Sequence, residues 1–381
     1  MGVSFWYPLF PIFLASSGLD LVQVGIVFAL GSATSIIGIP LGGYAGDVVG
    51  RKATIVLAGA VVCFGTGSLA LSPRGLAAVS YSLVMLGTTF GSGATQALLI
   101  ESSPMGKRGS AMASPLFLPS LAGIPMPLLG AVVGQAVGWS VVFGVSTVLL
   151  ATSVVGRQIG LSETMEQDGR PPKLSKSPRF SVIRRLAILS PIALVASVYL
   201  LDGFSEGSYS PFMPLYFTKF LGAPVEFYGA LSSIYLLLVA GIALVSGKAI
   251  DLGGAMKTMI ASFGLEAIAV FGMLLTRDWI VSGILFVIWE SVDLLDITAP
   301  SILIGEQVDS RSRAFALSSF GLLSRLSKVP GPGVGAILFG IFPTAILVLE
   351  LTVSVVSVVV LLSAPSLARF RKASSSGQGL R

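Results

Sequence analysis

Ionisable side chains inside long apolar segments are the residues of this sequence that could do chemistry. Glu290, Asp293 and Asp296 are spaced three apart, so their carboxyls share a broad face of one helix. Arg325 and Lys328, again three apart, lie in the next apolar segment. Burying a charge in apolar surroundings is costly unless the charge is paired. These groups are therefore candidates for binding protons or a charged solute.

A second acidic pair, Asp202 and Glu206, lies one helical turn apart in an earlier apolar segment. Tyr209 follows this pair, and Trp289 stands directly before Glu290. Crowded carboxyls in a low dielectric repel one another and take up protons more readily. Because the acids of these segments outnumber the bases, the sequence predicts a proton pathway that also favours cations.

Most of the apolar segments, including those that must position these side chains, are long enough to cross a bilayer. Hydrophobic residues make up 54% of the chain and charged residues 11%, and a span needs about 20 apolar residues. The segments are 4–16, 21–46, 53–71, 76–100, 110–134, 137–155, 187–218, 226–247, 258–276, 280–304, 314–340 and 342–363. We expect an all-α integral membrane protein with twelve transmembrane helices in two pseudo-symmetric six-helix bundles.

The polar stretches between these segments divide the chain. We expect an N-terminal bundle over 1–155, a cytoplasmic linker over 156–186, a C-terminal bundle over 187–364 and a cytoplasmic tail over 365–381. Most of the 24 Lys and Arg residues fall on one side of the predicted membrane, which places both termini in the cytoplasm. The sequence thus predicts a multi-pass protein of the plasma membrane.

The same composition argues against several other classes of protein. The net charge of +6 follows the topology and does not indicate a nucleic-acid partner. The chain has no His and a single Cys, and it lacks nucleotide-binding and metalloprotease motifs. We therefore expect no enzyme activity, no cofactor and no metal site.

Two halves of the sequence repeat each other at an offset of 204 or 205 residues. Several glycines, prolines and acids recur in the same order, which indicates a duplication. The matched pairs include Gly43 with Gly247, Asp47 with Asp251, Pro127 with Pro332, and Gly130 with Gly335. Two parallel membrane-embedded halves are typical of secondary transporters.

The loop after the second segment carries a recognisable motif. Gly43, Asp47, Gly50, Arg51 and Lys52 match G-x-x-x-D-[RK]-x-G-[RK]-[RK], the hallmark of the major facilitator superfamily, although Val48 replaces the usual base after the Asp. The chain resembles this superfamily over essentially its whole length. The resemblance implies that these five residues, with Arg108 and Asp251, latch the two halves together on the cytoplasmic side. A tight turn without a switching role is the alternative.

A second motif resembles the drug–proton antiporter branch of the superfamily. Pro127 with Gly130, and Pro332 with Gly335, are similar to the G-P-x-x-G-G element of that branch. Proline bends a helix and glycine allows close contact, so helix packing alone explains the pattern equally well. The branch also expects an arginine where this chain has Gly87.

Depth along the helices suggests partners for the buried charges. Asp293 and Arg325 lie at nearly equal depth, and so do Glu290 and Lys328, when residues are counted at ~1.5 Å each. We therefore expect these two ion pairs, with Asp296 left over. A buried network that merely joins two helices is the alternative.

The resemblance adds roles to these residues. In the superfamily, helices 1, 4, 7 and 10 line the central cavity, which would place Asp202, Glu206, Glu290, Asp293 and Asp296 in a substrate and proton pathway. The helices that carry Glu266 and Glu350 are peripheral in the family, and we assign those residues no role.

The expected function is secondary transport of a small molecule by alternating access. We favour proton-coupled efflux of a cationic or amphipathic compound by a monomer in the lipid bilayer. A proton-coupled importer of a small organic anion or metabolite that uses Arg325 is one alternative. Uniport, and a membrane scaffold or sensor without transport, are the others.

The first apolar segment is short. Only residues 4–16 are available for helix 1, against the ~20 that a span requires. We expect that helix 1 is truncated at its N-terminus, that Met1 is not the natural start, and that the natural chain is longer by roughly 16–25 residues. A short helix in a locally thinned bilayer is the alternative.

Overall fold

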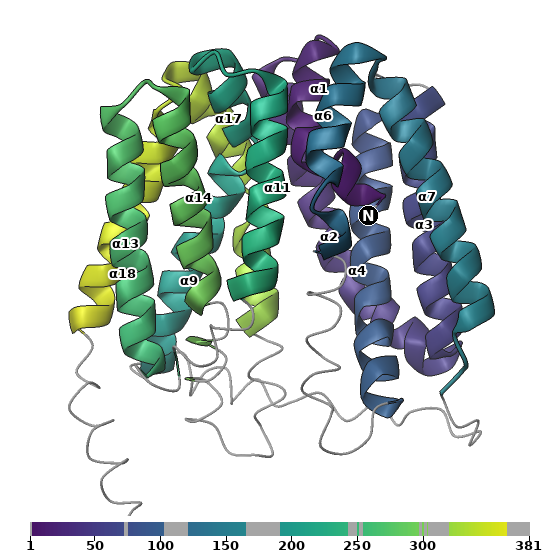
Figure 1. Cartoon of the computed structure of the whole chain (residues 1–381). Helices are drawn as coiled ribbons and strands as arrows, with labels where there is room; N and C mark the ends of the chain where they lie inside the picture. Colours follow the sequence, from purple (N-terminus) through teal and green to yellow (C-terminus); the bar gives the residue numbers. More distant parts are fainter. Residues whose placement is uncertain are drawn as a thin grey trace, which may run out of the picture.

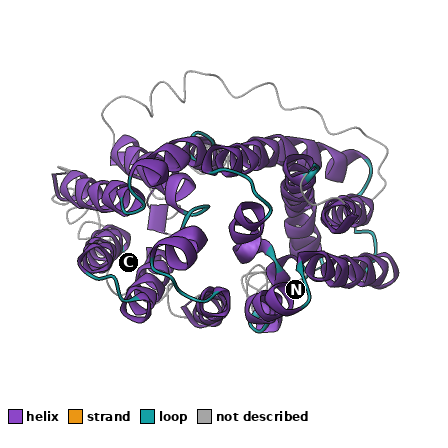
Figure 2. Ribbon diagram, turned by 90° about the horizontal axis from the view of Figure 1, so that it is seen from above, coloured by secondary structure: helices purple, strands orange, loops and turns teal. Residues whose placement is uncertain are grey.

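The computed structural model describes residues 2–71, 75–102, 121–164, 191–242, 250, 254–296, 299–300, 303 and 320–363. The regular structure of these residues is helical, and the helices form two bundles side by side (Figures 1 and 2). By length and hydropathy, six of the described helices could cross a membrane. The predicted all-α membrane fold is thus confirmed, while the total of twelve helices and the domain boundaries stay predictions.

The first half contributes one bundle. Its elements, in chain order, are η1 (Val3–Phe5), η2 (Tyr7–Leu9), α1 (Phe10–Ser16), α2 (Leu21–Val48), α3 (Arg51–Leu71), α4 (Ala77–Glu101), α6 (Met126–Ala136) and α7 (Trp139–Gly160). Helix α2 begins at a capping box, in which the Asp20 carboxylate accepts from the Gln23 amide and the Gln23 side chain accepts from the Asp20 amide. This pairing satisfies two amides at the helix start.

The second half contributes the other bundle. Its elements are α9 (Pro191–Tyr209), α10 (Met213–Leu215), η3 (Tyr216–Phe220), α11 (Val225–Ile242), α13 (Ala255–Leu275), α14 (Trp279–Asp296), α17 (Gly331–Ile341) and α18 (Ala345–Ser363). Helices α13 and α14 pack against each other, and α18 packs against both α9 and α13. These contacts bring α9, α13, α14 and α18 around one interior.

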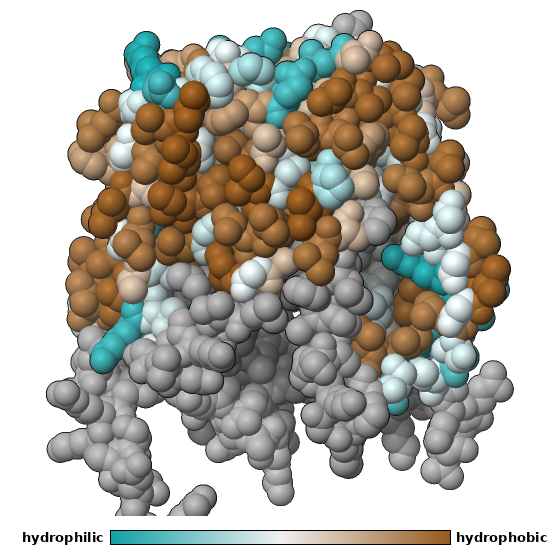
Figure 3. All heavy atoms as spheres, in the orientation of Figure 1, coloured by the Kyte–Doolittle hydropathy of each residue, from teal (hydrophilic) through white to brown (hydrophobic). Residues whose placement is uncertain are grey.

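Large apolar side chains cover the outside of the bundles. Leu265, Ile268, Phe271 and Leu275 of α13 are all exposed, and apolar residues dominate the described surface in Figure 3. A water-soluble protein rarely exposes continuous apolar patches of this extent. The surface fits the hydrocarbon of a bilayer.

Stacked aromatic rings fix the short helix α1 within the first bundle. The Phe10 ring stacks on Tyr81 of α4 at 5.0 Å between centroids, and Phe13 meets Phe143 of α7 edge-on at 4.9 Å. Phe10, Phe13 and Phe143 are fully or almost fully buried. Ring pairs at such distances add to the gain from burial, so α1 is held from two sides.

The two bundles meet along two seams that repeat each other. Helix α2 packs against α17, and α6 packs against α11. A Cβ added to Gly25 would lie 2.7 Å from the Pro332 carbonyl oxygen. At the other seam, a Cβ added to Gly229 would lie 2.9 Å from the Pro127 carbonyl oxygen. Gly25 and Gly229 are 204 residues apart and so are equivalent positions of the two halves. The same contact therefore occurs twice, once from a glycine of the first half and once from a glycine of the second.

The two motif glycines pack within their own bundles. A Cβ added to Gly130 would lie 1.8 Å from the Phe5 carbonyl oxygen, and one added to Gly335 would lie 1.9 Å from the Ser208 carbonyl oxygen. Phe5 precedes α1 and Ser208 lies in α9, the corresponding helix of the second half. In each copy of the motif, proline therefore faces the other bundle and glycine faces its own.

Adding a methyl group at either seam tests this symmetry. We expect Gly25→Ala and Gly229→Ala each to lower the thermal unfolding midpoint in detergent, because the methyl overpacks a backbone carbonyl at a cost of ~1–3 kcal/mol. Gly333→Ala is the matched control, since a Cβ at this exposed position of α17 meets nothing within 4 Å. A control as damaging as the seam variants would contradict the close-contact interpretation.

Candidate functional site

A cavity of about 410 Å³ lies between the two halves. The start of the chain forms one wall, and α9, α11 and α14 form the others. Three carboxyls and four tyrosines give the lining its character: Glu206, Glu290, Asp293, Tyr7, Tyr209, Tyr228 and Tyr235. The structure thus brings together four of the residues predicted from the sequence, Glu206, Tyr209, Glu290 and Asp293.

One cation neutralises part of this acidic wall. The half-buried Lys328 ammonium forms an ion pair with the Glu206 carboxylate of α9. The predicted ion pair between Lys328 and Glu290 is therefore wrong. Residues 320–327 are helical, but the helix is interrupted at Lys328 before α17 begins at Gly331. Depth counted along a continuous helix does not hold across that interruption.

The second predicted ion pair, Asp293 with Arg325, is also wrong. The Arg325 side chain is exposed, and none of the ion pairs among the described residues includes Asp293 or Glu290. Asp296 ends α14, but its side chain lies outside the part that the structure describes. The cavity wall therefore keeps two carboxyls with no cation paired to them among the described residues.

Trp289 lies behind the cavity wall instead of in it. Its side chain is fully buried, and its ring packs against Tyr209 at 4.5 Å between centroids. The Phe286 ring, which also lines the cavity, meets it edge-on at 5.8 Å. The sequence predicted Trp289 as a pathway residue. In the structure it contacts Tyr209 and Phe286 of the cavity wall but does not itself line the cavity.

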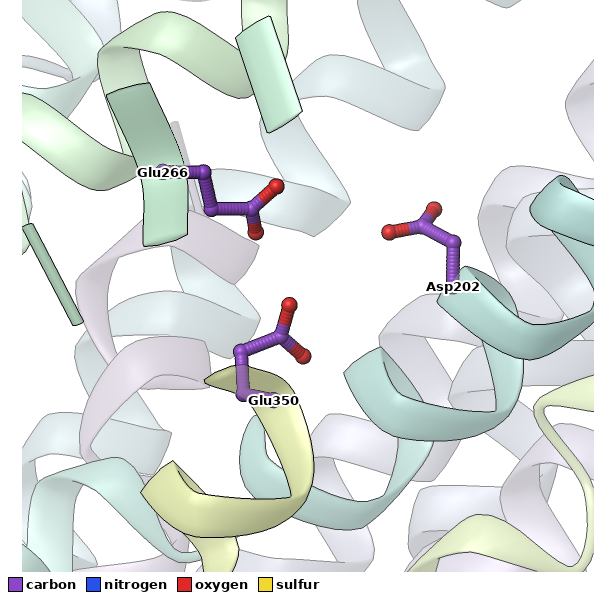
Figure 4. Close-up of side chains that lie close together, drawn as sticks. All are labelled: Asp202, Glu266 and Glu350. Atoms are coloured by element: carbon purple, nitrogen blue, oxygen red, sulfur yellow. The ribbon is translucent and has the colours of Figure 1, made fainter. Parts of the chain in front are cut away.

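Behind Trp289 lies a second acidic group, which joins the predicted pathway residue Asp202 to two acids to which the sequence assigned no role. The carboxyl oxygens of Asp202, Glu266 and Glu350 lie within 4.8 Å of one another. Figure 4 shows the three side chains pointing toward one another from α9, α13 and α18. Glu266 and Glu350 are buried, at 3% and 1% exposure. Their burial in apolar helices was the available signal.

Neighbouring donors stabilise this carboxyl cluster. The Ser205 hydroxyl donates to Glu350 at 2.5 Å, and the Trp289 indole N–H donates to Glu266 at 2.5 Å. Ionised carboxylates so close together repel strongly in a low dielectric. The cluster therefore needs a shared proton or a bound cation to persist. Among the described residues it is the group that could hold a metal ion, and its all-oxygen ligands would suit a hard cation.

The motif loop forms a network at the opposite end of the first bundle from Gly25. Arg51 pairs with Asp47 one turn earlier, and its guanidinium lies 3.4 Å from Glu101 at the end of α4. Glu101 in turn accepts from the Thr164 hydroxyl at 2.5 Å. The described contacts join α2, α3, α4 and the segment after α7, all in the first half.

Glu163 caps the start of α3, a contact that the sequence did not suggest. Its two carboxylate oxygens accept from the backbone amides of Arg51 at 2.9 Å and of Lys52 at 3.1 Å. Gly50 makes this approach possible, because its φ is +114° and a Cβ there would lie 2.5 Å from the carboxylate. Acceptors at a helix N-terminus satisfy amides that have no partner within the helix.

The latch between the two halves remains a prediction. Arg108 and Asp251 lie outside the described residues, and a Cβ at Gly43 would meet nothing within 4 Å. The described contacts of Asp47, Gly50, Arg51 and Lys52 all lie within the first half.

Comparisons with known proteins agree with this architecture. The sequence model of the Major Facilitator Superfamily matches residues 1–201 and residues 195–379. No curated protein matches the chain.

Solved structures similar to this chain include three kinds of transporter. Human organic anion transporter MFSD10 (TETRAN) is 15% identical with a TM-score of 0.68, over 94% of this chain and 95% of that one. A D-xylose–proton symporter is 14% identical with a TM-score of 0.73, over 95% and 93%. Nucleoside transporter NupG is 13% identical with a TM-score of 0.72, over 96% of each chain. At these identities the likeness shows the fold alone.

The Lys328–Glu206 pair can be tested with a double-mutant cycle. We expect Lys328→Met and Glu206→Gln each to lower stability and yield, because each leaves an unpaired charge inside the bundle. The double variant should be more stable than either single variant, as measured by unfolding midpoints in detergent. Arg325→Met is the control, and should have little effect. A double variant that behaves as the sum of the single variants would contradict the pairing.

The cap on α3 gives a separate prediction. We expect Glu163→Gln to speed hydrogen exchange at the Arg51 and Lys52 amides and to cost ~0.5–2 kcal/mol of stability, as for other lost helix caps. Ser162→Ala, at the exposed neighbouring position, should change neither quantity. Unaltered exchange in Glu163→Gln would show that the carboxylate does not hold these amides.

Proposed function

The chain belongs to the major facilitator superfamily, and we propose that it is a secondary active transporter that exports a cationic or amphipathic compound in exchange for protons. The observation that carries this proposal is the cavity between the halves, with its three carboxyls and four tyrosines. Sites for small molecules are concave, largely apolar and furnished with a few charged or polar groups. This cavity has that character.

The charges of the cavity favour a cation. Lys328 neutralises Glu206, which leaves Glu290 and Asp293 as the acidic groups facing the solute. The tyrosine rings offer faces that attract cations. Carboxyls in such a wall can also bind a proton when the solute leaves, which is the requirement for exchange at one site.

The alternatives receive less support from the geometry. An importer of a small organic anion would use Arg325, but that side chain is exposed and does not line the cavity. The similar structures include transporters of organic anions, D-xylose and nucleosides, so the fold does not select a substrate. A scaffold or sensor would have no need of carboxyls in an apolar interior, where each is costly.

Alternating access would follow from the two seams. The Gly25–Pro332 and Gly229–Pro127 contacts join the bundles at the end away from the motif loop. Rocking of one bundle against the other would separate these contacts and expose the cavity at that end. We place both termini and the motif loop in the cytoplasm of a plasma-membrane protein that acts as a monomer. The same proposal assigns the chain to the drug–proton antiporter branch of the superfamily.

Transport assays in proteoliposomes test the proposed function. With an imposed pH gradient, we expect organic cations such as tetraphenylphosphonium and benzyltrimethylammonium to be transported in the direction opposite to the protons. Benzoate should not be transported. Proton movement that depends on the cation should be abolished in the Glu290→Gln, Asp293→Asn double variant, because the cavity then lacks its unpaired acids. Arg325→Gln should retain transport. Benzoate uptake that Arg325→Gln abolishes would support the anion importer instead.

A further inference from the structure

Trp289 contacts two parts of the second bundle, the wall of the cavity and the cluster of buried carboxyls. On one side its ring contacts Tyr209 and Phe286, which line the cavity. On the other side its indole N–H donates to Glu266 of α13, which does not line the cavity. A fully buried ring held by both contacts has one position available to it.

We propose that Glu266 and Trp289 are positioning residues that set the aromatic wall of the cavity, and through it the affinity for the transported cation. Glu266 would act by accepting the indole N–H, and Trp289 would act by holding Tyr209 against the cavity. This inference rests on the proposed function for its solute, but its geometry does not depend on transport.

The hydrogen bond from Trp289 to Glu266 sets the position of the indole ring, and through it the position of Tyr209 in the cavity wall. Trp289 carries a single N–H donor, and at this burial no water replaces a lost acceptor. Without Glu266 the ring would turn or shift to find another acceptor. Tyr209 lies 4.5 Å from it and would have to follow.

Glu266 is itself fixed by its surroundings. Glu350 of α18 and Asp202 of α9 lie beside its carboxyl (Figure 4). Ser205 of α9 donates to Glu350. Glu266 therefore lies among side chains of two other helices, α9 and α18, which limit the positions open to the acceptor for Trp289.

Three substitutions separate this role from simple support of the fold. Glu266→Gln keeps an acceptor oxygen for the indole, whereas Glu266→Leu removes it, and Trp289→Phe keeps a ring but removes the donor. Trp279→Phe is the matched control, because Trp279 begins the same helix and packs on Phe227, which does not line the cavity.

The first readout is cation transport in proteoliposomes, with tetraphenylphosphonium as the probe. We expect Glu266→Leu and Trp289→Phe to raise KM about tenfold, as for one broken buried hydrogen bond, with kcat little changed. Glu266→Gln and Trp279→Phe should stay near the wild-type KM. Equal losses in Glu266→Gln and Glu266→Leu, or a wild-type KM in Trp289→Phe, would overturn the proposal.

The second readout needs no transported solute. Ser210 lines the cavity next to Tyr209, so a cysteine placed there by Ser210→Cys, with Cys63→Ser to remove the native thiol, reports on the wall. We expect Glu266→Leu to change its rate of labelling by a cationic methanethiosulfonate reagent several-fold, and Glu266→Gln to leave the rate unchanged. Unchanged labelling in Glu266→Leu would overturn the positioning role. Altered labelling in a protein that moves no organic cation would instead sink the proposed function alone.

Discussion

The cost of placing ionisable groups inside an apolar bundle shapes the second half of this protein. Three acids in the interior of this half are each held by a different kind of donor: Lys328 for Glu206, Ser205 for Glu350 and Trp289 for Glu266. A buried charge without such a partner is strongly destabilising. The positions of α9, α13, α14 and α18 are therefore tied together by chemistry as well as by packing.

The duplication separates packing from chemistry. Both halves use a glycine opposite a proline carbonyl at the seam between the bundles, Gly25 with Pro332 and Gly229 with Pro127. Only the second half carries acids in the interior of its described helices. The first half instead places its charges at the helix ends, where Glu163 and Arg51 organise the motif loop. In the proposed transporter, the second half would supply the charges that bind the solute, and both halves would supply the surfaces that move.

The sequence was sufficient for the fold and insufficient for the pairing of charges. Hydropathy and the repeat are each averaged over many residues, so a misread single position changes them little. They therefore predict two helical halves correctly. Counting residues gives the depth of a side chain but not the face on which it lies. Lys328 shows the limit, because the helix is interrupted there and its ammonium meets α9 instead of α14. Asp202, too, proved to face away from the cavity toward Glu266 and Glu350.

Glu266 and Glu350, to which the sequence assigned no role, share one property: each is the single acid of its helix. Glu266 and Glu350 have no spacing pattern, since their partners come from other helices, and only the packing of α13 and α18 against α9 brings them to Asp202. Glu163 likewise meets α3 from 111 or 112 positions away. Long-range polar contacts of this kind carry no local signal. They nevertheless decide where Trp289 stands, and Trp289 backs the wall that a solute would touch.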